Sequence, residues 1–229
     1  MNMTNRNRLN VASRWDKIQQ KEKEYLMLNG SKYMYLKARL FGFIAGDGNI
    51  TLDDKLRNRH NTIKFFHDHH SLLQPFSEAL LKVYNKVPHI KKFDKYYYLT
   101  ADSKVAVQDM VNTAEFGVKK WRVPYKILID KECKKEWLRA FFDCEAYVGK
   151  NHIKVQCINE IGIVQVAALL KEFNIESNKY EYQPKNKNWN KNHILIIGKK
   201  DMKKNFLEFI GFNHELKLLK LKNTLNIYK

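Results

Sequence analysis

Two acidic residues, Asp47 and Glu145, end two apolar stretches of the sequence in the same pattern. Residues 40–48 read LFGFIAGDG, and residues 138–146 read LRAFFDCEA. We interpret both stretches as helices, with the acid at the C-terminal end of each. If the two ends meet, the paired carboxylates and the negative ends of the helix dipoles favour a cation. Carboxylate oxygens with open positions for water and phosphate suit Mg²⁺.

Small residues predict that these two helices pack closely against each other. Gly42 and Gly46 are four residues apart in the first stretch, and Ala140 and Cys144 are four apart in the second. Residues at this spacing share one face of a helix. Because small side chains allow two backbones to approach, we predict that these four residues form the helix interface.

The two motifs resemble those of the LAGLIDADG homing endonucleases in their single-chain form, from about Tyr33 onward. The resemblance implies an α+β fold in which two pseudo-symmetric αββαββα halves surround the two-helix interface, with an antiparallel saddle that binds DNA. It also implies that Asp47 and Glu145, at the eighth motif position, share two or three Mg²⁺ ions, for which Mn²⁺ can substitute. Ala146 stands where the pattern has glycine.

By the same resemblance, we expect a site-specific endonuclease that makes Mg²⁺-dependent double-strand breaks. Its target would be a long asymmetric DNA sequence, cut to leave short 3′ overhangs. The flanks show no splicing frame closed by a His-Asn pair, so we expect an intron-encoded or free-standing protein active in intron homing. Two alternatives stay open: a maturase that binds intron RNA, and a non-catalytic regulator that binds DNA.

The composition favours a nucleic-acid partner. The 229 residues carry a formal net charge of +18, which attracts polyanions. Three cysteines without a CxxC pair favour free thiols in a reducing compartment. With no apolar run of 18 residues, we expect an intracellular monomer of the cytoplasm or nucleoid, or of an organelle in a eukaryote. It would bind double-stranded DNA and no membrane.

The predicted elements divide the chain into a basic N-terminal extension, residues 1–33, and two halves, residues 34–130 and 131–229. The extension contains a predicted helix over residues 12–27. For the first half we predict helices at 33–46, 71–83 and from Ser103, with strands at 49–52, 62–67, 87–93 and 96–101. For the second half we predict helices at 133–144, 161–173, 202–210 and 214–225, with strands at 146–149, 153–158, 180–183 and 193–197. This order is an internal repeat of about 90 residues, and its strands could lie in a major groove.

Three further residues are candidates for assisting the two acids. His67 ends the second strand of the first half, and Gln156 lies on the equivalent strand of the second half. The resemblance implies that polar residues there order water around the acids. Lys150 follows Glu145 closely and could stabilise the charge of a scissile phosphate. Each of the three is equally well explained as a polar residue on the surface.

Residues 67–70, His-Asp-His-His, are a poor zinc motif because neighbouring residues on a strand point to opposite faces. Basic residues on the predicted strands and loops are candidates for DNA contact, although each is equally a solvated surface charge: Arg57, Arg59, Lys64, Lys92, Lys154 and Lys187.

Overall fold

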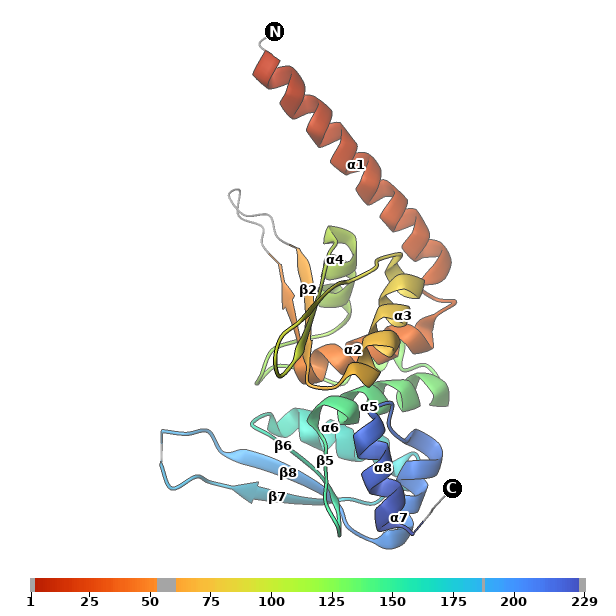
Figure 1. The fold of residues 1–229 in the computed structure, drawn as a ribbon, viewed down its shortest axis with the longest axis vertical. Helices are drawn as coiled ribbons and strands as arrows, with labels where there is room; N and C mark the ends of the chain where they lie inside the picture. The colour runs from red at the N-terminus through yellow and green to blue at the C-terminus, as the bar shows by residue number, and fades with distance from the viewer. Residues whose placement is uncertain (1–2, 53–60, 187, 227–229) are drawn as a thin grey trace.

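The chain forms two halves of the same design around a central pair of helices, α2 and α5 (Figure 1). The computed structural model describes residues 3–52, 61–186 and 188–226, with side chains from residue 13 onward. Each half contains a four-stranded antiparallel sheet, and both sheets have their strands in the order first, second, fourth, third. The internal repeat and the α+β fold are therefore confirmed.

The strands have the following bounds. The first sheet consists of β1 (Gly48–Thr51), β2 (Thr62–His67), β3 (His89–Lys92) and β4 (Tyr97–Asp102). The second sheet consists of β5 (Tyr147–Val148), β6 (Ile153–Cys157), β7 (Asn178–Tyr182) and β8 (Asn192–Ile197).

The helices flank these sheets. They are α1 (Met3–Asn29), α2 (Met34–Asp47), α3 (Leu73–Tyr84), α4 (Lys104–Thr113), α5 (Lys131–Glu145), α6 (Glu160–Lys171), α7 (Lys200–Asn205) and α8 (Glu215–Thr224). Short 3₁₀ turns span His70–Leu72 and Tyr125–Ile127, and a π-helical turn, Phe206–Ile210, continues α7. Ser103 caps α4 as predicted, because its side chain accepts a hydrogen bond from the Ala106 N–H. None of the helices described here is both long and apolar enough to cross a bilayer.

Helices α2 and α5 touch through small residues. A Cβ atom added at Gly42 would lie closer than 3.0 Å to the Trp137 carbonyl oxygen and to the Ala140 side chain, and one added at Gly46 would strike the Cys144 side chain. The two backbones are therefore as close as the absence of a side chain allows. The same contact brings the C-terminal ends of both helices together.

A buried ion pair joins the two helices further along the interface. The Glu136 carboxylate, on α5, is 2% exposed and accepts a hydrogen bond of 2.6 Å from Arg39 Nε of α2. Its second oxygen lies 2.7 Å from Arg139 Nη1. Removing one partner of a buried pair typically costs about 3–5 kcal/mol, since the other charge remains buried. This pair therefore fixes how α2 lies along α5.

Strand alternation decides which side chains of each sheet face the helices. On β2, Ile63, Phe65 and His67 are buried, whereas Phe66 is exposed. On β6, Ile153 and Val155 are buried and Gln156 is exposed. Because residues two apart share a face, Cys157 takes the inward position on β6 that His67 takes on β2. The other face of each sheet is turned away from the core.

Several element bounds differ from the sequence prediction, most of them by one or two residues. Helix α1 begins at Met3 instead of near residue 12, since residues 3–28 contain neither glycine nor proline to interrupt it. It projects from the first half as a long rod (Figure 1) and is attached where Ser103 donates a 2.7 Å hydrogen bond to Glu22. Strand β7 begins at Asn178, and the predicted helix 202–210 is divided between α7 and the π-helical turn.

Candidate functional site

Asp47 and Glu145 are the last residues of α2 and α5, so the helix contact places both carboxylates in one region. The Glu145 Cγ atom is only 3.6 Å from where a Cβ of Gly46 would be. The Asp47 side chain is 39% exposed, which opens the region to solvent. Both helices end in extended backbone, at Gly48 (φ −102°) and at Ala146 (φ −81°). Ala146 therefore fits where the motif pattern has glycine.

The two carboxylates are costly to ionise together. Burial, with the Asp47 charge as a second cause, raises the pKa of Glu145 to about 7. Burial also raises the pKa of Asp47, although the nearby His67 and Lys217 lower it in part. Two acids that resist ionisation in this way are the donor set that a divalent cation would stabilise, because its charge favours both ionised forms.

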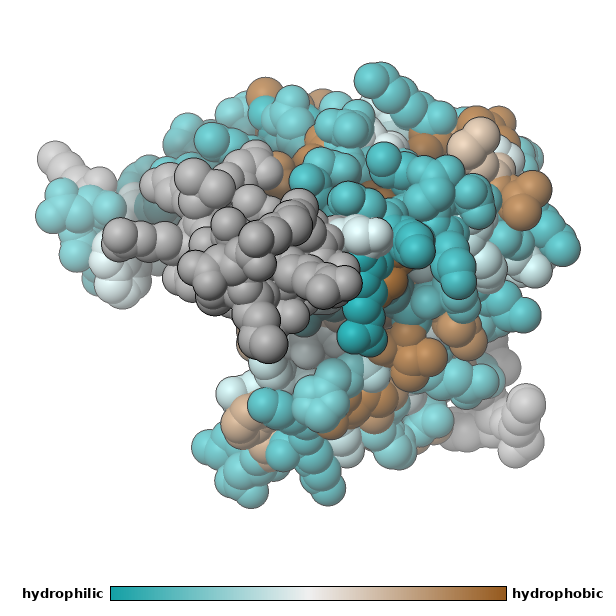
Figure 2. Space-filling view, turned by 90° about the horizontal axis from the view of Figure 1, so that it is seen from above, coloured by the Kyte–Doolittle hydropathy of each residue, from teal (hydrophilic) through white to brown (hydrophobic). Residues whose placement is uncertain are grey.

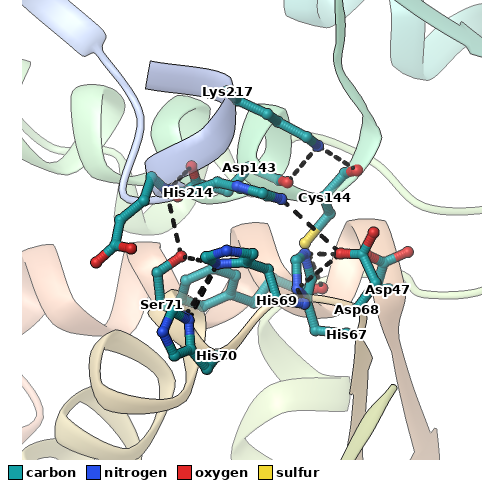
Figure 3. Close-up of polar contacts among 12 residues, drawn as sticks. Asp47, His67, Asp68, His69, His70, Ser71, Asp143, Cys144, His214 and Lys217 are labelled. Carbon is teal, nitrogen blue, oxygen red and sulfur yellow. Dashed lines mark hydrogen bonds and ion pairs between the residues drawn. The ribbon is translucent and has the colours of Figure 1, made fainter. Parts of the chain in front are cut away.

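Lys217, on α8, supplies the fixed positive charge of the site. Its Nζ donates hydrogen bonds to the backbone carbonyls of Asp143 (2.5 Å) and Cys144 (2.9 Å), in the last turn of α5 (Figure 3). It thereby satisfies free carbonyls at the negative end of that helix. Burial lowers the pKa of Lys217, whereas the acids nearby raise it. Sequence reasoning placed this residue only within a basic helix at 214–225.

Asp143 holds α8 in the position that Lys217 requires. Its buried carboxylate accepts hydrogen bonds from the Asn213 N–H (2.9 Å), the Asn213 side-chain amide (3.0 Å) and the His214 N–H (2.9 Å). These donors immediately precede α8, so Asp143 anchors the start of that helix to α5. Burial raises the pKa of Asp143 to about 7, against the effect of these hydrogen bonds.

His67 is brought to Asp47 by the inward face of β2. Its side chain is 2% exposed, and its Nε2 atom lies 3.8 Å from the Asp47 Oδ2 atom. The Nδ1 atom accepts a hydrogen bond of 3.0 Å from the His69 N–H and lies 3.3 Å from the Asp68 carboxylate. Burial lowers the pKa of His67, although both acids raise it in part. The neutral ring therefore carries its proton on Nε2, facing Asp47.

Gln156 and Lys150 are both exposed side chains. Gln156 is exposed on the outward face of β6, where its side-chain oxygen is 3.5 Å from Lys154 Nζ. The inward neighbour is Cys157, whose pKa is raised to about 11 by burial and by the Glu145 charge. Lys150 is exposed in the turn that the Gly149 N–H closes on the His152 carbonyl. Gln156 faces outward because neighbouring residues on a strand point to opposite faces, and its equivalent position in the sequence did not reveal which face it would take.

The outward sheet faces combine lysines with aromatic rings. Lys64 and Lys154 lie on these faces, and Phe66 stacks on Tyr98 with ring centroids 4.7 Å apart. Lys92 pairs in register with Tyr97 and so belongs to the opposite face by alternation. The predicted DNA contacts Arg57, Arg59 and Lys187 lie outside the described residues.

The end of the molecule near α1 presents a surface on which hydrophilic residues predominate, with hydrophobic groups between them (Figure 2). A large contiguous apolar patch is the usual mark of a protein partner. On the described part of this view, hydrophilic surface outweighs hydrophobic surface.

Comparisons with known proteins agree with this architecture. Residues 132–211 match the LAGLIDADG-like domain family. The homing endonuclease I-DmoI, solved in complex with DNA and Mn, is 18% identical, covers 77% of this chain and 96% of its own, and has a TM-score of 0.61. Full-length DUF199/WhiA from Thermatoga maritima is 17% identical over 86% of this chain and 61% of its own, with a TM-score of 0.56.

Two curated relatives contain a segment similar to most of this chain. Both are from Methanocaldococcus jannaschii: a glutamine–fructose-6-phosphate aminotransferase (27% identity over 83% of this chain) and a replication factor C small subunit (29% over 86%). The chain spans only 17% and 10% of their lengths, respectively. The activities in those names therefore do not transfer to this chain, and the structural likenesses establish its fold.

Proposed function

From the LAGLIDADG fold of this chain, we propose that it is a site-specific, metal-dependent endonuclease that cuts both strands of DNA. The observation that carries the proposal is the meeting of Asp47 and Glu145 at the ends of two touching helices, beside Lys217. The fold is shared by I-DmoI and DUF199/WhiA. Because one fold can carry different functions, a shared fold does not establish an activity. The case for DNA cleavage therefore depends on the two acids.

The residues present fit a divalent cation of the magnesium type. Asp47 and Glu145 offer hard oxygen donors, and a cation would offset the burial and the Asp47 charge that raise the pKa of Glu145. I-DmoI structures have been solved with DNA and Mn and with DNA and Ca. When bound, such a cation would supply an activated water and stabilise the leaving 3′ oxygen.

The chain's own groups would prepare the site for a phosphodiester. Lys217 keeps a positive charge beside two acids that would otherwise repel the DNA backbone. His67, neutral near pH 7 and with its Nε2 proton toward Asp47, would orient that carboxylate. Because Lys217 is fixed by two carbonyls, its charge would be in place before DNA binds.

The two sheets would contact the duplex through their outward faces. Lysines there would bind phosphates, and the exposed rings and amides would contact base edges in the major groove. The outward residues differ between the halves, as with Phe66 on β2 and Gln156 on β6. An asymmetric target follows from this difference. The proposal further includes a long target, short 3′ overhangs, action as a monomer and a role in intron homing.

Separate removal of the two charges tests the proposal. Asp47→Asn and Glu145→Gln keep side-chain size, so we expect DNA binding to persist while cleavage falls on the order of 100-fold or more, since even an outer-shell partner of a metal ligand contributes about 10–100-fold. Glu132→Gln is the matched control, because Glu132 is an exposed acid in the first turn of α5. Gel shift and cleavage on one substrate, with Ca²⁺ as a binding control, provide the measurement.

Three outcomes would redirect the assignment. If either variant cuts at the parental rate, the acid that it replaces is not a ligand of the catalytic metal. An unaltered chain that binds duplex DNA without cutting any sequence in a randomised pool would favour a non-catalytic regulator. Tighter binding to intron RNA than to duplex DNA would favour a maturase.

A further inference from the structure

Asp47 also faces a second group of donors, on the side of the site turned toward β2. Asp47, His67 and Cys144 each place one ligand atom within 4.8 Å of the other two (Figure 3). The three residues come from different elements, α2, β2 and α5, and the Asp47 to His67 distance is 3.8 Å. This set offers one oxygen, one nitrogen and one sulfur.

These donors suit zinc better than magnesium. Thiolate and imidazole are ligands of zinc and similar transition metals, whereas Mg²⁺ requires oxygen. In a tetrahedral zinc site, ligand atoms at ordinary bond lengths are about 3.3–3.6 Å apart. The Asp47 to His67 separation of 3.8 Å is close to that of an assembled site, whereas the separations from Cys144 are bounded only by 4.8 Å, so binding would draw the three ligand atoms inward. Three protein ligands would leave a fourth position open, and the exposed Asp47 side chain would give access to it.

Asp68 completes the arrangement around His67. A histidine that binds metal through one ring nitrogen usually donates its other N–H to a carboxylate, which fixes the ring. The Asp68 Oδ1 atom is 3.3 Å from His67 Nδ1, while His67 Nε2 faces Asp47. Metal on Nε2 would place the proton on Nδ1, and Asp68 would accept it in place of the present hydrogen bond from His69.

We propose that Asp47, His67 and Cys144 form a second metal site, which takes zinc or a cation of the same preference, with Asp68 as the carboxylate that orients His67. Thiolate and carboxylate together would balance the two charges of the cation. Because Asp47 would serve both this site and the proposed pair with Glu145, zinc would compete with magnesium for Asp47. Zinc binding itself is independent of the proposed nuclease activity, whereas its effect on cutting rests on that activity.

Cobalt titration of the metal-free full-length chain tests the site. Co²⁺ takes the same ligands as zinc and reports a bound thiolate by a charge-transfer band in the near ultraviolet. We expect one such band, reversed by Zn²⁺ and lost in Cys144→Ser and in His67→Gln. Cys157→Ser is the matched control and should keep the band, since Cys157 is an inward thiol outside the donor set. Asp68→Asn should keep the band and weaken binding about 10–100-fold.

Circular dichroism of each variant would show whether it has folded, so that a lost band is read only from folded protein. A band that persists in Cys144→Ser, or the absence of any band in the unaltered chain, would overturn the proposal. A Co²⁺ spectrum that lacks the thiolate band and that is lost in His214→Gln would also overturn the proposal. That result would place the metal at His67, Asp68 and His214, whose ligand atoms likewise lie within 4.8 Å of one another.

Cleavage assays distinguish a failure of this site from a failure of the nuclease assignment. For each variant, the rate in Mg²⁺ with zinc is divided by the rate in Mg²⁺ alone. A thiolate band in a chain that cuts no DNA would support the zinc site and reject the nuclease. A chain that cuts DNA in Mg²⁺ but shows no thiolate band would support the nuclease and reject the zinc site. Cutting at an unchanged rate under saturating zinc would reject the shared use of Asp47.

Discussion

Glu145 makes the stability of the metal-free chain depend on pH. Its pKa rises from an ordinary value of 4.5 to about 7 on folding, so the folded chain holds this proton more tightly than the unfolded chain. The contribution of this proton to stability is fully present below about pH 4.5 and is lost as pH rises through about 7. Divalent metal should reverse the loss, because it favours the ionised form.

Glu145→Gln should remove this dependence. We expect the metal-free variant to gain stability over the parent as pH rises from about 5 to about 8, by about 1–3 kcal/mol after allowance for partial exposure. Asp143, whose pKa is also raised to about 7, is present in both proteins and so cancels in the difference. Urea unfolding at several pH values in EDTA measures it. Parallel stability curves for the two proteins would show that the Glu145 pKa is not raised.

Lys217 should contribute more to stability and to cleavage than any exposed lysine of α8. Lys217→Met removes two charged hydrogen bonds to α5, a loss of about 1.5–3 kcal/mol each at most, and leaves the acids without their fixed cation. We expect a lower melting temperature and slower cleavage, with duplex binding largely kept. Lys220→Met, on the exposed side of α8, is the control and should change neither. Equal effects of the two substitutions would contradict the role of Lys217.

The sequence could reveal Asp47 and Glu145 because the acids lie within repeated local motifs. It could not reveal Lys217 or Asp143, whose partners are about seventy residues away along the chain. Lys217 is also one of many lysines, and Asp143 is hidden in an apolar run that predicts only a buried helix. These residues could not be found from the sequence because their partners are distant along the chain. Their chemistry is not unusual.

At the scale of elements, local patterns predicted some boundaries and missed others. Strand β2 spans Thr62–His67 as predicted, since its alternating buried and exposed residues match a strand with one face on the core. Helix α1 was predicted too short because its apolar stripe is weak beyond the part that touches the first half. An apolar stripe reflects side-chain packing, whereas the backbone of α1 continues as a rod that projects away from the first half (Figure 1).

Gly42→Ala should measure the closeness of α2 and α5. The added methyl group would meet the Trp137 backbone carbonyl, which cannot turn aside as a side chain can. We expect a loss of about 1–3 kcal/mol in the free energy of unfolding. Gly198→Ala is the control, because its nearest neighbour would be 3.9 Å away. If the two variants unfold at the same urea concentration, the helices do not meet at Gly42.

At the scale of the molecule, the net charge of +18 should dominate affinity for DNA. Each phosphate contact releases counterions, so with roughly 6–10 contacts affinity should fall on the order of 10³ to 10⁵ between about 50 and 200 mM salt. Fluorescence anisotropy with a labelled duplex measures this slope. A nearly flat titration would contradict binding of the duplex backbone by the sheets.

The link between α5 and α8 also sets an order of events during synthesis. Both acids leave the ribosome well before Lys217 does, because α8 follows the whole second sheet in the chain. Until α8 emerges, the Asp143 carboxylate lacks the N–H donors of Asn213 and His214, and the end of α5 lacks its cation. A nascent chain thus carries both acids without the assembled site. If the proposed nuclease activity is correct, cutting would have to wait until Lys217 has emerged from the ribosome and contacted the end of α5.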